Sequence, residues 1–290
     1  MKNKRKVNST GVGLGLHARR ILAYVVLIIV SFFCLFWFYV LFVNATRSNS
    51  NLQSGFSVLP SSNLLSNWKH LLEKSGLPVI QGMLNSLIIS TCSAVVCVYF
   101  STMTAYAIHV YDFKLKKFIY PFILAVMMIP TQVTALGFVN LVSDMNLEDS
   151  FIPLIIPQIA VPITFFYMKQ YMESSLPLSL VEAARIDGSG EFRTFNHIVL
   201  PLMKPAIAVQ AIFTFVSSWN NYFIPALILH DDSKKTLPIL IAQLRAADWL
   251  KFDMGQVYVM IAFSIFPVIV VYLILSKHIV QGVALGSVKG

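Results

Sequence analysis

The sequence predicts an all-α protein that crosses a membrane six times. Of its 290 residues, 57% are hydrophobic and only 12% are charged, whereas roughly a quarter of the residues are charged in an average globular protein. Six apolar stretches are each long enough to cross the roughly 30 Å hydrocarbon core of a bilayer as a helix. These stretches are residues 21–43, 85–108, 118–141, 151–171, 206–229 and 256–276.

The first apolar stretch, 21–43, follows a basic tail made of residues 1–20. A basic tail before an apolar run also opens a secretory signal peptide. This run is too long for one, however, and no convincing small-residue cleavage site follows it. We therefore expect it to be retained as the first transmembrane helix.

Positive charges are distributed unevenly between the two sides of the predicted membrane. The terminal tails, the 109–117 loop and the 169–205 segment together hold 15 Lys and Arg, whereas the three opposite loops hold 7. Because cytoplasmic loops are enriched in Lys and Arg, we expect both termini, 1–20 and 277–290, in the cytoplasm. The net charge of +9 thus indicates contact with membrane lipid and not with nucleic acid, since the basic residues flank apolar runs.

The longest outer connection is an extracytoplasmic loop, residues 44–80. Within it, Asn67 to Lys74 followed by Gly76 predicts a short surface helix, and the segment is a candidate contact for an external partner. The core, 81–276, holds the other five helices and a cytoplasmic loop at 172–205. Prolines within or beside these helices predict kinks, namely Pro130, Pro153, Pro157, Pro162, Pro205, Pro225 and Pro267.

Predicted helices two to six contain no Asp or Glu, and Lys169 is their only Lys or Arg. Near the inner end of the fourth helix, we expect Lys169 to extend to the lipid headgroups. Proton-coupled transport has no obvious carrier, because it needs ionisable groups at depth. A phosphate-binding loop requires Gly-Lys, a dipeptide that this sequence lacks, so we expect this chain to bind no nucleotide cofactor.

Catalytic and metal-binding patterns are also missing. Cys34, Cys92 and Cys97 lie in apolar runs without C-x-x-C spacing, so we expect packing residues and neither disulfides nor a metal site. The sequence has no H-E-x-x-H or G-x-S-x-G motif. The run from His230 to Asp232 could hold a cation weakly, although adjacent carboxylates on a turn are ordinary surface residues. We therefore expect a protein that is not an enzyme.

The long cytoplasmic loop carries the most regular pattern. Ser179 and Glu182 have the spacing of a capping box, and Gly188 is a left-handed stop, which together predict a helix over 180–187. A second segment follows, whose apolar stripe is formed by Phe192, Phe195 and Val199. A two-turn helix is marginal in water. It must therefore pack either on this chain's own inner surface or on a cytoplasmic protein.

This loop resembles the EAA-x3-G-x9-I-x-LP loop of ABC-importer membrane subunits at every fixed position. The matching residues are Glu182, Ala183, Ala184, Gly188, Ile198, Leu200 and Pro201. The resemblance implies a type I ABC importer transmembrane fold, in which a coupling helix sits in a cleft of a separate ATPase subunit. It gives this docking role to Glu182, Ala183, Ala184, Arg185, Asp187 and Gly188, with Ile198, Leu200 and Pro201 supporting the loop.

The same resemblance implies a multi-pass subunit of the bacterial cytoplasmic membrane that works by alternating access. Its partners would be a cytoplasmic ATPase dimer, which uses ATP and Mg, and an extracytoplasmic solute-binding protein. A second, homologous permease subunit would complete the pathway, most simply as a heterodimer.

Further stretches are similar to the maltose-type subunits of the carbohydrate-uptake branch. They are Asn85-Ser86-Leu87, Ala105-Tyr106-Ala107, Met128-Ile129-Pro130, Trp219-Asn220 and Val288-Lys289-Gly290. Ser189 departs from the alanine of many relatives. The implied function is the permease subunit of an ATP-driven sugar or oligosaccharide importer. The alternatives are an ABC importer for peptide, phosphate or polyamine, a secondary carrier or channel, and a structural scaffold.

Sugar sites combine aromatic faces with amide side chains, which cost less to bury than charges. The fifth predicted helix holds both in residues 217–222, and Asn221 and Gln132 are the first choices for a substrate pathway. The other candidates are Asn220, Trp219, Tyr222, Asn140 and Asn85, with Gln210 as a companion. Amides also bond helices to one another in membranes, so a packing role stays open for each.

Overall fold

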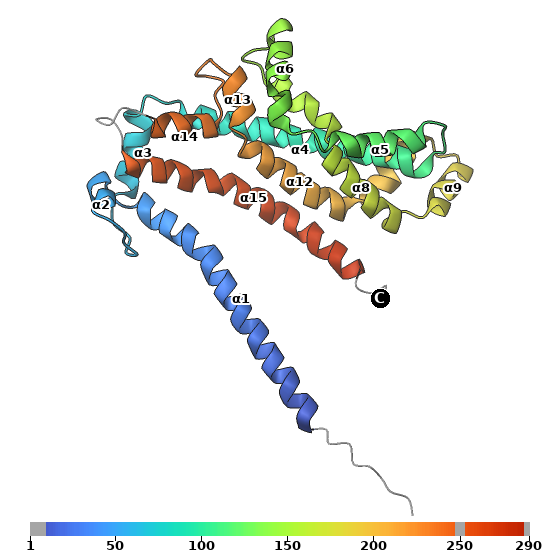
Figure 1. Ribbon diagram of the computed structural model, residues 1–290, viewed down its shortest axis with the longest axis horizontal. Coiled ribbons are helices and arrows are strands. Elements are labelled where there is room, and N and C mark those ends of the chain that lie inside the picture. Colours follow the sequence, from blue (N-terminus) through green and yellow to red (C-terminus); the bar gives the residue numbers. More distant parts are fainter. Residues whose placement is uncertain (1–9, 247–252, 287–290) are drawn as a thin grey trace, which may run out of the picture. The chain divides into compact units, whose positions relative to one another are not determined.

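The computed structural model describes residues 10–246 and 253–286, so the tail stretch Val288-Lys289-Gly290 lies outside the described residues. The described residues form helices and no strand, which confirms the all-α prediction (Figure 1). Four helices are long and apolar enough to cross a membrane, and up to six spans result if each of two bent pairs is one. Two compact units divide the chain, Met1–His70 with Asp253–Ala262 and Leu71–Phe252 with Phe263–Gly290.

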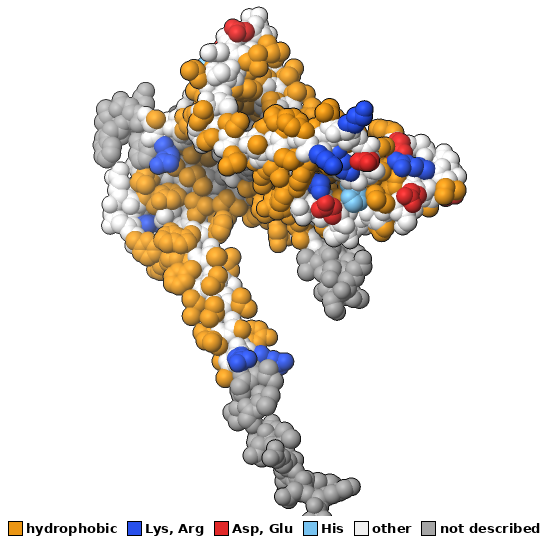
Figure 2. All heavy atoms as spheres, turned by 45° about the vertical axis from the view of Figure 1, so that its right-hand side comes forward, with side chains coloured by type: hydrophobic (Ala, Val, Ile, Leu, Met, Phe, Trp, Pro, Cys, Tyr) orange, Lys and Arg blue, Asp and Glu red, His pale blue; other side chains and the backbone are white. Residues whose placement is uncertain are grey.

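The first unit is built on one long helix, α1 (Thr10–Ala45). Its apolar side chains are exposed along most of its length, and Arg19 and Arg20 lie near one end (Figure 2). None of the side chains in its most apolar window is buried. This pattern is typical of a helix that faces lipid on all sides.

Two short helices follow α1, namely α2 (Asn49–Gln53) and α3 (Leu64–Glu73). The buried side chain of Asn67 on α3 donates through Nδ2 to the carbonyls of Ala45, at 2.9 Å, and Arg47, at 2.8 Å. α3 is the surface helix predicted from Asn67 to Lys74, although it begins three residues earlier. Gly76 follows it with a positive φ of 69°.

The second unit is organised around α4 (Val79–Val110), which packs against α8 (Pro162–Ser175) and α12 (Lys204–Trp219). The buried face of α4 is rich in small side chains, which let helix backbones approach closely in a membrane. They are Gly82, Ser86, Ser90, Ser93, Ala94, Cys97, Ser101, Thr102 and Ala105. α4 is therefore the central support of this unit.

The chain bends sharply within the third predicted span and just before the fifth. α5 (Lys116–Val126) and α6 (Thr131–Asp144) meet at 97°, and the loop segment 191–202 meets α12 at 81°. Pro130 directly precedes α6, and Pro205 lies in the first turn of α12, where a missing N–H costs no helical hydrogen bond. Two of the prolines predicted to kink the spans thus lie at the breaks. We treat α12 as the spanning part of the second pair and residues 191–202 as loop.

The remaining elements belong to the second unit, except that the first residues of α15, up to Ala262, belong to the first. The fourth span is composite, with α7 (Ile152–Ile155), the 3-10 turn η1 (Ile156–Ala160) and α8. The fifth predicted helix ends at Trp219, and its remainder forms the separate helix α13 (Phe223–Ile228). α14 (Leu237–Arg245) is a further helix that was not among the predicted spans. It has nine residues, which are too few to cross a bilayer. α15 (Met254–Gly286) is the last span and has Pro267 inside it.

Two side-chain predictions have different outcomes. The ammonium group of Lys169 pairs with Glu173 and lies 4.6 Å from the centroid of the Tyr120 ring. The charge of Lys169 is thus compensated within the chain, and its extension to the headgroups stays a prediction. Cys97 is buried as predicted, but Cys34 and Cys92 are exposed on helices long enough to face lipid, so they do not pack inside the fold.

Asn85 on α4 generates a prediction about stability. Its Nδ2 donates to the carbonyls of Ser233, at 2.9 Å, and Lys235, at 3.0 Å. Asn85→Ala leaves both acceptors without this donor, so we expect it to lower the free energy of unfolding by about 1–3 kcal/mol. The measurement is the melting temperature of the purified protein. Asn140→Ala, at an exposed position of α6, is the control, and equal melting temperatures for the two variants would contradict the prediction.

Candidate functional site

The predicted coupling loop contains α9 (Leu178–Ile186). Pro177 precedes this helix with an extended backbone, and no side chain caps the helix start. A residue before proline is driven out of the helical region, so Leu176 ends α8 and the next helix starts directly after Pro177. Ser179 then lies inside α9, and the predicted capping box is wrong.

The end of α9 is the predicted glycine stop. Gly188 has a φ of 78°. The N–H of Ser189 donates to the carbonyl of Ala184 at 2.9 Å, and that of Gly188 to the carbonyl of Arg185 at 3.0 Å. This pair of hydrogen bonds is a Schellman motif, which satisfies the last carbonyls of a helix and favours glycine at its left-handed residue. The prediction for Gly188 is confirmed.

The turn after α9 is held by the Glu191 cluster, which consists of Tyr106, Tyr111, Arg185 and Glu191. Arg185 Nε donates to Glu191 Oε1 over 2.6 Å, and the hydroxyl of Tyr106 donates to Oε2 over 2.9 Å. The guanidinium carbon of Arg185 lies 5.5 Å from the centroid of the Tyr111 ring. Because Tyr106 belongs to α4, the cluster ties the loop to the end of the central helix.

Charge keeps the cluster closed over a wide pH range. The Arg185 guanidinium first, and then the Tyr111 hydroxyl, lower the pKa of Glu191 from its ordinary value of 4.5 to about 2. A lowered pKa means that the carboxylate's contribution is complete above the ordinary value and is lost only as the pH falls toward 2. Burial first, and then Glu191, raise the pKa of Tyr111. At neutral pH the carboxylate is therefore charged and the phenol is protonated.

α9 presents two different faces. Val181 and Ala184 are buried, and Val181 belongs to the core cluster beneath the loop. The opposite face exposes Glu182, Ala183 and Asp187, together with Ile186, whose side chain is 86% exposed. Charged side chains gather at the end of the second unit that carries this loop (Figure 2). The exposed face suits a protein partner, whereas Ala184, which the resemblance placed in docking, lies on the supporting face.

The second half of the loop consists of α10 (Glu191–Thr194), the π turn η2 (Phe195–Val199) and α11 (Leu200–Leu202). Phe195 and Val199 are buried, but Phe192 is 73% exposed. The predicted stripe is wrong at Phe192, because the buried Thr194 occupies the inward position of that turn. The other motif residues support the turn toward α12, with Ile198 and Leu200 half-buried and Pro201 exposed.

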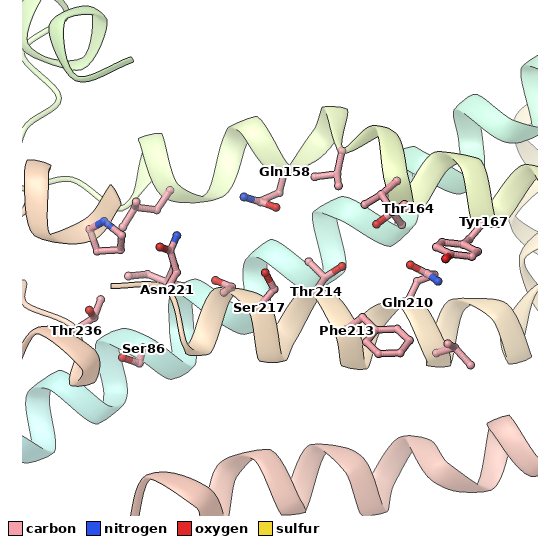
Figure 3. A pocket seen from close by; sticks show the side chains of 17 residues that line it. Ser86, Gln158, Thr164, Tyr167, Gln210, Phe213, Thr214, Ser217, Asn221 and Thr236 are labelled. Carbon is pink, nitrogen blue, oxygen red and sulfur yellow. The ribbon is translucent and has the colours of Figure 1, made fainter. Parts of the chain in front are cut away.

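A cavity of about 580 Å³ lies between α4, the composite α7–α8 span and α12 (Figure 3). Among the described residues, its lining combines hydroxyls and amides with two aromatic rings and contains no charged side chain. The polar groups come from Ser86, Gln158, Thr164, Gln210, Thr214, Ser217, Ser218, Asn221 and Thr236, and the rings from Tyr167 and Phe213. The hydroxyl of Thr236 is buried and has no hydrogen-bonding partner among the described residues. The cavity can therefore still donate and accept hydrogen bonds.

The predicted pathway residues lie in different places. Asn221 lines the cavity, whereas Gln132 and Asn140 are exposed on α6, and Asn220 is exposed after α12. Trp219 is buried, with its ring 5.7 Å from that of Phe215. Tyr222 lines a separate cavity of about 360 Å³ near His230. Asn85 is engaged with two backbone carbonyls, which fits the packing alternative.

Most of the cavity lining is absent from the predicted pathway set, including Gln158, Thr164 and Tyr167. Gln158 is an amide in an apolar run, and this is the one sequence signal that could have identified it as a pathway residue. The face on which it lies depends on the 3-10 turn η1, which follows from the spacing of Pro153, Pro157 and Pro162. The sequence shows these prolines but not the direction in which the turn aims the amide.

Comparison with known proteins decides the family. Residues 98–285 match the family described as "Binding-protein-dependent transport system inner membrane component". The chain belongs to this family. It is 36% identical over 209 residues to the arabinooligosaccharides transport system permease protein AraQ of Bacillus subtilis (strain 168), which covers 71% of this chain and 72% of that protein. The chain is thus an ABC transporter permease, as the loop motif indicated.

Other relatives differ in the solutes that their names mention. The permease is 31% identical over 267 residues to the sn-glycerol-3-phosphate transport system permease protein UgpE of Yersinia pestis, covering 90% of this chain and 95% of that protein. Its fold matches a bacterial ABC transporter involved in the import of the acidic polysaccharide alginate. That match has a TM-score of 0.74 at 22% identity and covers 94% of this chain and 99% of the other. It confirms the importer fold.

The Glu191 cluster generates a prediction about local stability. Glu191→Gln removes the charge that Arg185 and Tyr106 share, so we expect faster amide exchange across 178–195. Hydrogen–deuterium exchange of the purified permease at neutral pH measures this effect. Arg185→Glu with Glu191→Arg restores one ion pair but not the acceptor for Tyr106, so protection should return only in part. Glu73→Gln changes an exposed glutamate of α3 as the control, and equal exchange in it and in Glu191→Gln would count against the cluster.

Proposed function

We propose that this permease serves an ATP-driven, binding-protein-dependent importer whose solute is a sugar, most specifically an oligosaccharide. The observation that carries the proposal is that one helix, α4, both holds the docking loop through Tyr106 and lines an uncharged polar cavity through Ser86. A loop exposed to a partner and a cavity between spans are the two parts that coupled import requires.

The chemistry of the cavity supports a sugar. Its volume of about 580 Å³ lies within the range of roughly 300–1,000 Å³ that is common for small-molecule sites. Hydroxyls and amides, such as those of Gln158 and Asn221, can satisfy the hydroxyls of a sugar. The rings of Tyr167 and Phe213 offer apolar faces for its C–H surface.

The same chemistry speaks against the alternative solutes. In the part of the chain that the structure describes, no Lys, Arg or His lines the cavity to pair with a phosphate, and no Asp or Glu lines it to pair with a polyamine. A buried charge without a partner costs several kcal/mol. Because the cavity offers no such partner, we favour a neutral solute of the kind named for AraQ over the anionic solute named for UgpE.

The energy must enter through α9. The Gly-Lys dipeptide of a phosphate-binding loop is absent from this sequence. We therefore assign ATP and Mg to a cytoplasmic ATPase dimer. This dimer docks on the exposed face of α9, which is formed by Glu182, Ala183, Ile186 and Asp187. The distribution of Lys and Arg supports a cytoplasmic position for that loop and for both termini in a bacterial cell. An extracytoplasmic solute-binding protein would deliver the sugar on the other side.

A second permease subunit completes the proposed pathway. Gln132, Asn140 and Asn220 are exposed and do not line the cavity of this subunit. We propose that these amides face a solute pathway between the two subunits of a permease pair, most simply a heterodimer. Alternating access then follows if the ATPase moves α9 and the Glu191 cluster passes that movement to α4.

The proposal predicts sugar uptake by the complete transporter in proteoliposomes. Uptake of labelled oligosaccharide should require ATP and the binding protein, whereas sn-glycerol-3-phosphate should not be taken up. Gln158→Ala removes about one hydrogen bond to the sugar, so the solute concentration for half-maximal uptake should rise about two- to tenfold. Asn221→Ala removes another amide of the cavity and should raise the same solute concentration in this assay.

Gln53→Ala, which changes an exposed amide on α2, is the matched control and should transport normally. Uptake of sn-glycerol-3-phosphate in place of sugar would overturn the assignment of the solute. Uptake that continues without any ATPase subunit would overturn the assignment of the mechanism.

A further inference from the structure

A short segment between α2 and α3 exposes large apolar side chains at a place that the importer function does not explain. This segment, called the tip here, consists of residues 55–59. Phe56 is 70% exposed, Val58 44% and Leu59 72%. The tip belongs to the first unit, which also contains α1. No described residue covers these three apolar side chains.

Hydrogen bonds fix the tip against the side of α1. The Tyr39 hydroxyl donates to the carbonyl of Val58 over 2.6 Å. After the tip, the chain returns to the end of α1, where the N–H of Ser61 donates to Thr46 Oγ1 at 2.8 Å and that of Asn63 to the carbonyl of Thr46 at 2.9 Å. The chain thus descends along α1 and comes back, and Figure 1 shows this loop beside the α2 end of α1.

The helical rise gives the depth of the tip. Tyr39 precedes Thr46 by seven residues, which is about 10 Å along a helix, and it lies about 6 Å inside the end of the apolar stretch at Val43. The side chains of α1 around Tyr39 are themselves exposed, with Phe38 at 49% and Trp37 at 68%. The tip therefore lies at the level of exposed apolar side chains of α1.

We propose that the tip is a membrane anchor, inserted into the boundary between headgroups and acyl chains of the leaflet at the Ala45 end of α1. Its depth matches the roughly 5–10 Å at which interfacial segments bury their apolar side chains. Phe56, Val58 and Leu59 enter the lipid, and two backbone groups beside these side chains have hydrogen-bonding partners. The carbonyl of Val58 receives the Tyr39 hydroxyl, and the N–H of Leu59 donates to Ser57 Oγ at 3.1 Å.

The base of the tip is built to hold this position. The guanidinium of Arg47 is buried and donates to the carbonyl of Gly55 at 2.8 Å, and also to that of Asn51. Gly55 itself has a φ of 121°, a conformation that is open to glycine and strained for other residues. The turn that sends the chain down along α1 is thus fixed from both sides.

A solute-binding protein is the competing occupant, since the outer segment was expected to meet an external partner. The geometry favours lipid, because the tip continues the exposed apolar surface of α1 and lies below the end of that helix. A soluble protein docking on the outer segment would meet residues beyond Thr46 first, such as Leu65 of α3, which is 80% exposed.

Two leucines give a matched test in the complete transporter, reconstituted in proteoliposomes. In a background with Cys34→Ser, Cys92→Ser and Cys97→Ala, a single Leu59→Cys or Leu65→Cys carries an environment-sensitive fluorophore. We expect strong quenching of the label at position 59 by phospholipids spin-labelled near the top of the acyl chain, and weak quenching at position 65. Iodide in the water should give the reverse order.

Equal lipid quenching at the two positions, or stronger iodide quenching at 59, would overturn the anchor. Shielding of position 59 from iodide that appears only when the solute-binding protein is added would overturn it in favour of a protein contact. Because the readout is the location of a label and not transport, the outcome is independent of which solute the permease carries.

Discussion

The carboxylate of Glu191 is the interaction on which the rest of the functional unit depends. It accepts from Arg185 at the end of α9 and from Tyr106 on α4, 85 residues earlier in the chain. A two-turn helix is not stable alone, and the buried Val181 and Ala184 fix only its underside. The Glu191 cluster adds directional contacts at its far end. α9 can then move only together with the end of α4.

The construction of α4 determines what such a movement does. Small side chains along its buried face let α8 and α12 pack closely against it, and the cavity lies where these helices separate. Ser86 and Tyr106 are on the same helix, 20 residues and about 30 Å apart, so one rigid element joins the loop to the cavity. The described residues of the lining carry no charge. A neutral, hydroxyl-rich solute can therefore enter and leave the cavity without the free-energy cost of desolvating a charged group.

The sequence predicts the spans and the glycine stop because both are local. A hydrophobic run predicts a span from its own residues, and the stop of α9 needs only the left-handed conformation of Gly188 itself. Other roles depend on partners far away in the chain, which the local pattern does not show. Tyr106 bonds Glu191, 85 residues later, and Asn85, for which a packing role was left open, bonds a loop about 150 residues away. The cavity was predicted only in part, because the direction of Gln158 depends on a 3-10 turn between prolines.

The central claim is that α9 and α4 move as one body during transport. Spin labels at the exposed Ser179 on α9, outside the docking face, and at the exposed Thr104 on α4 report the distance between them by double electron–electron resonance in the complete transporter. The distribution of distances should stay the same with ATP, with ADP and without nucleotide, while distances between the two permease subunits change. A distance between Ser179 and Thr104 that shifts with nucleotide would contradict the account.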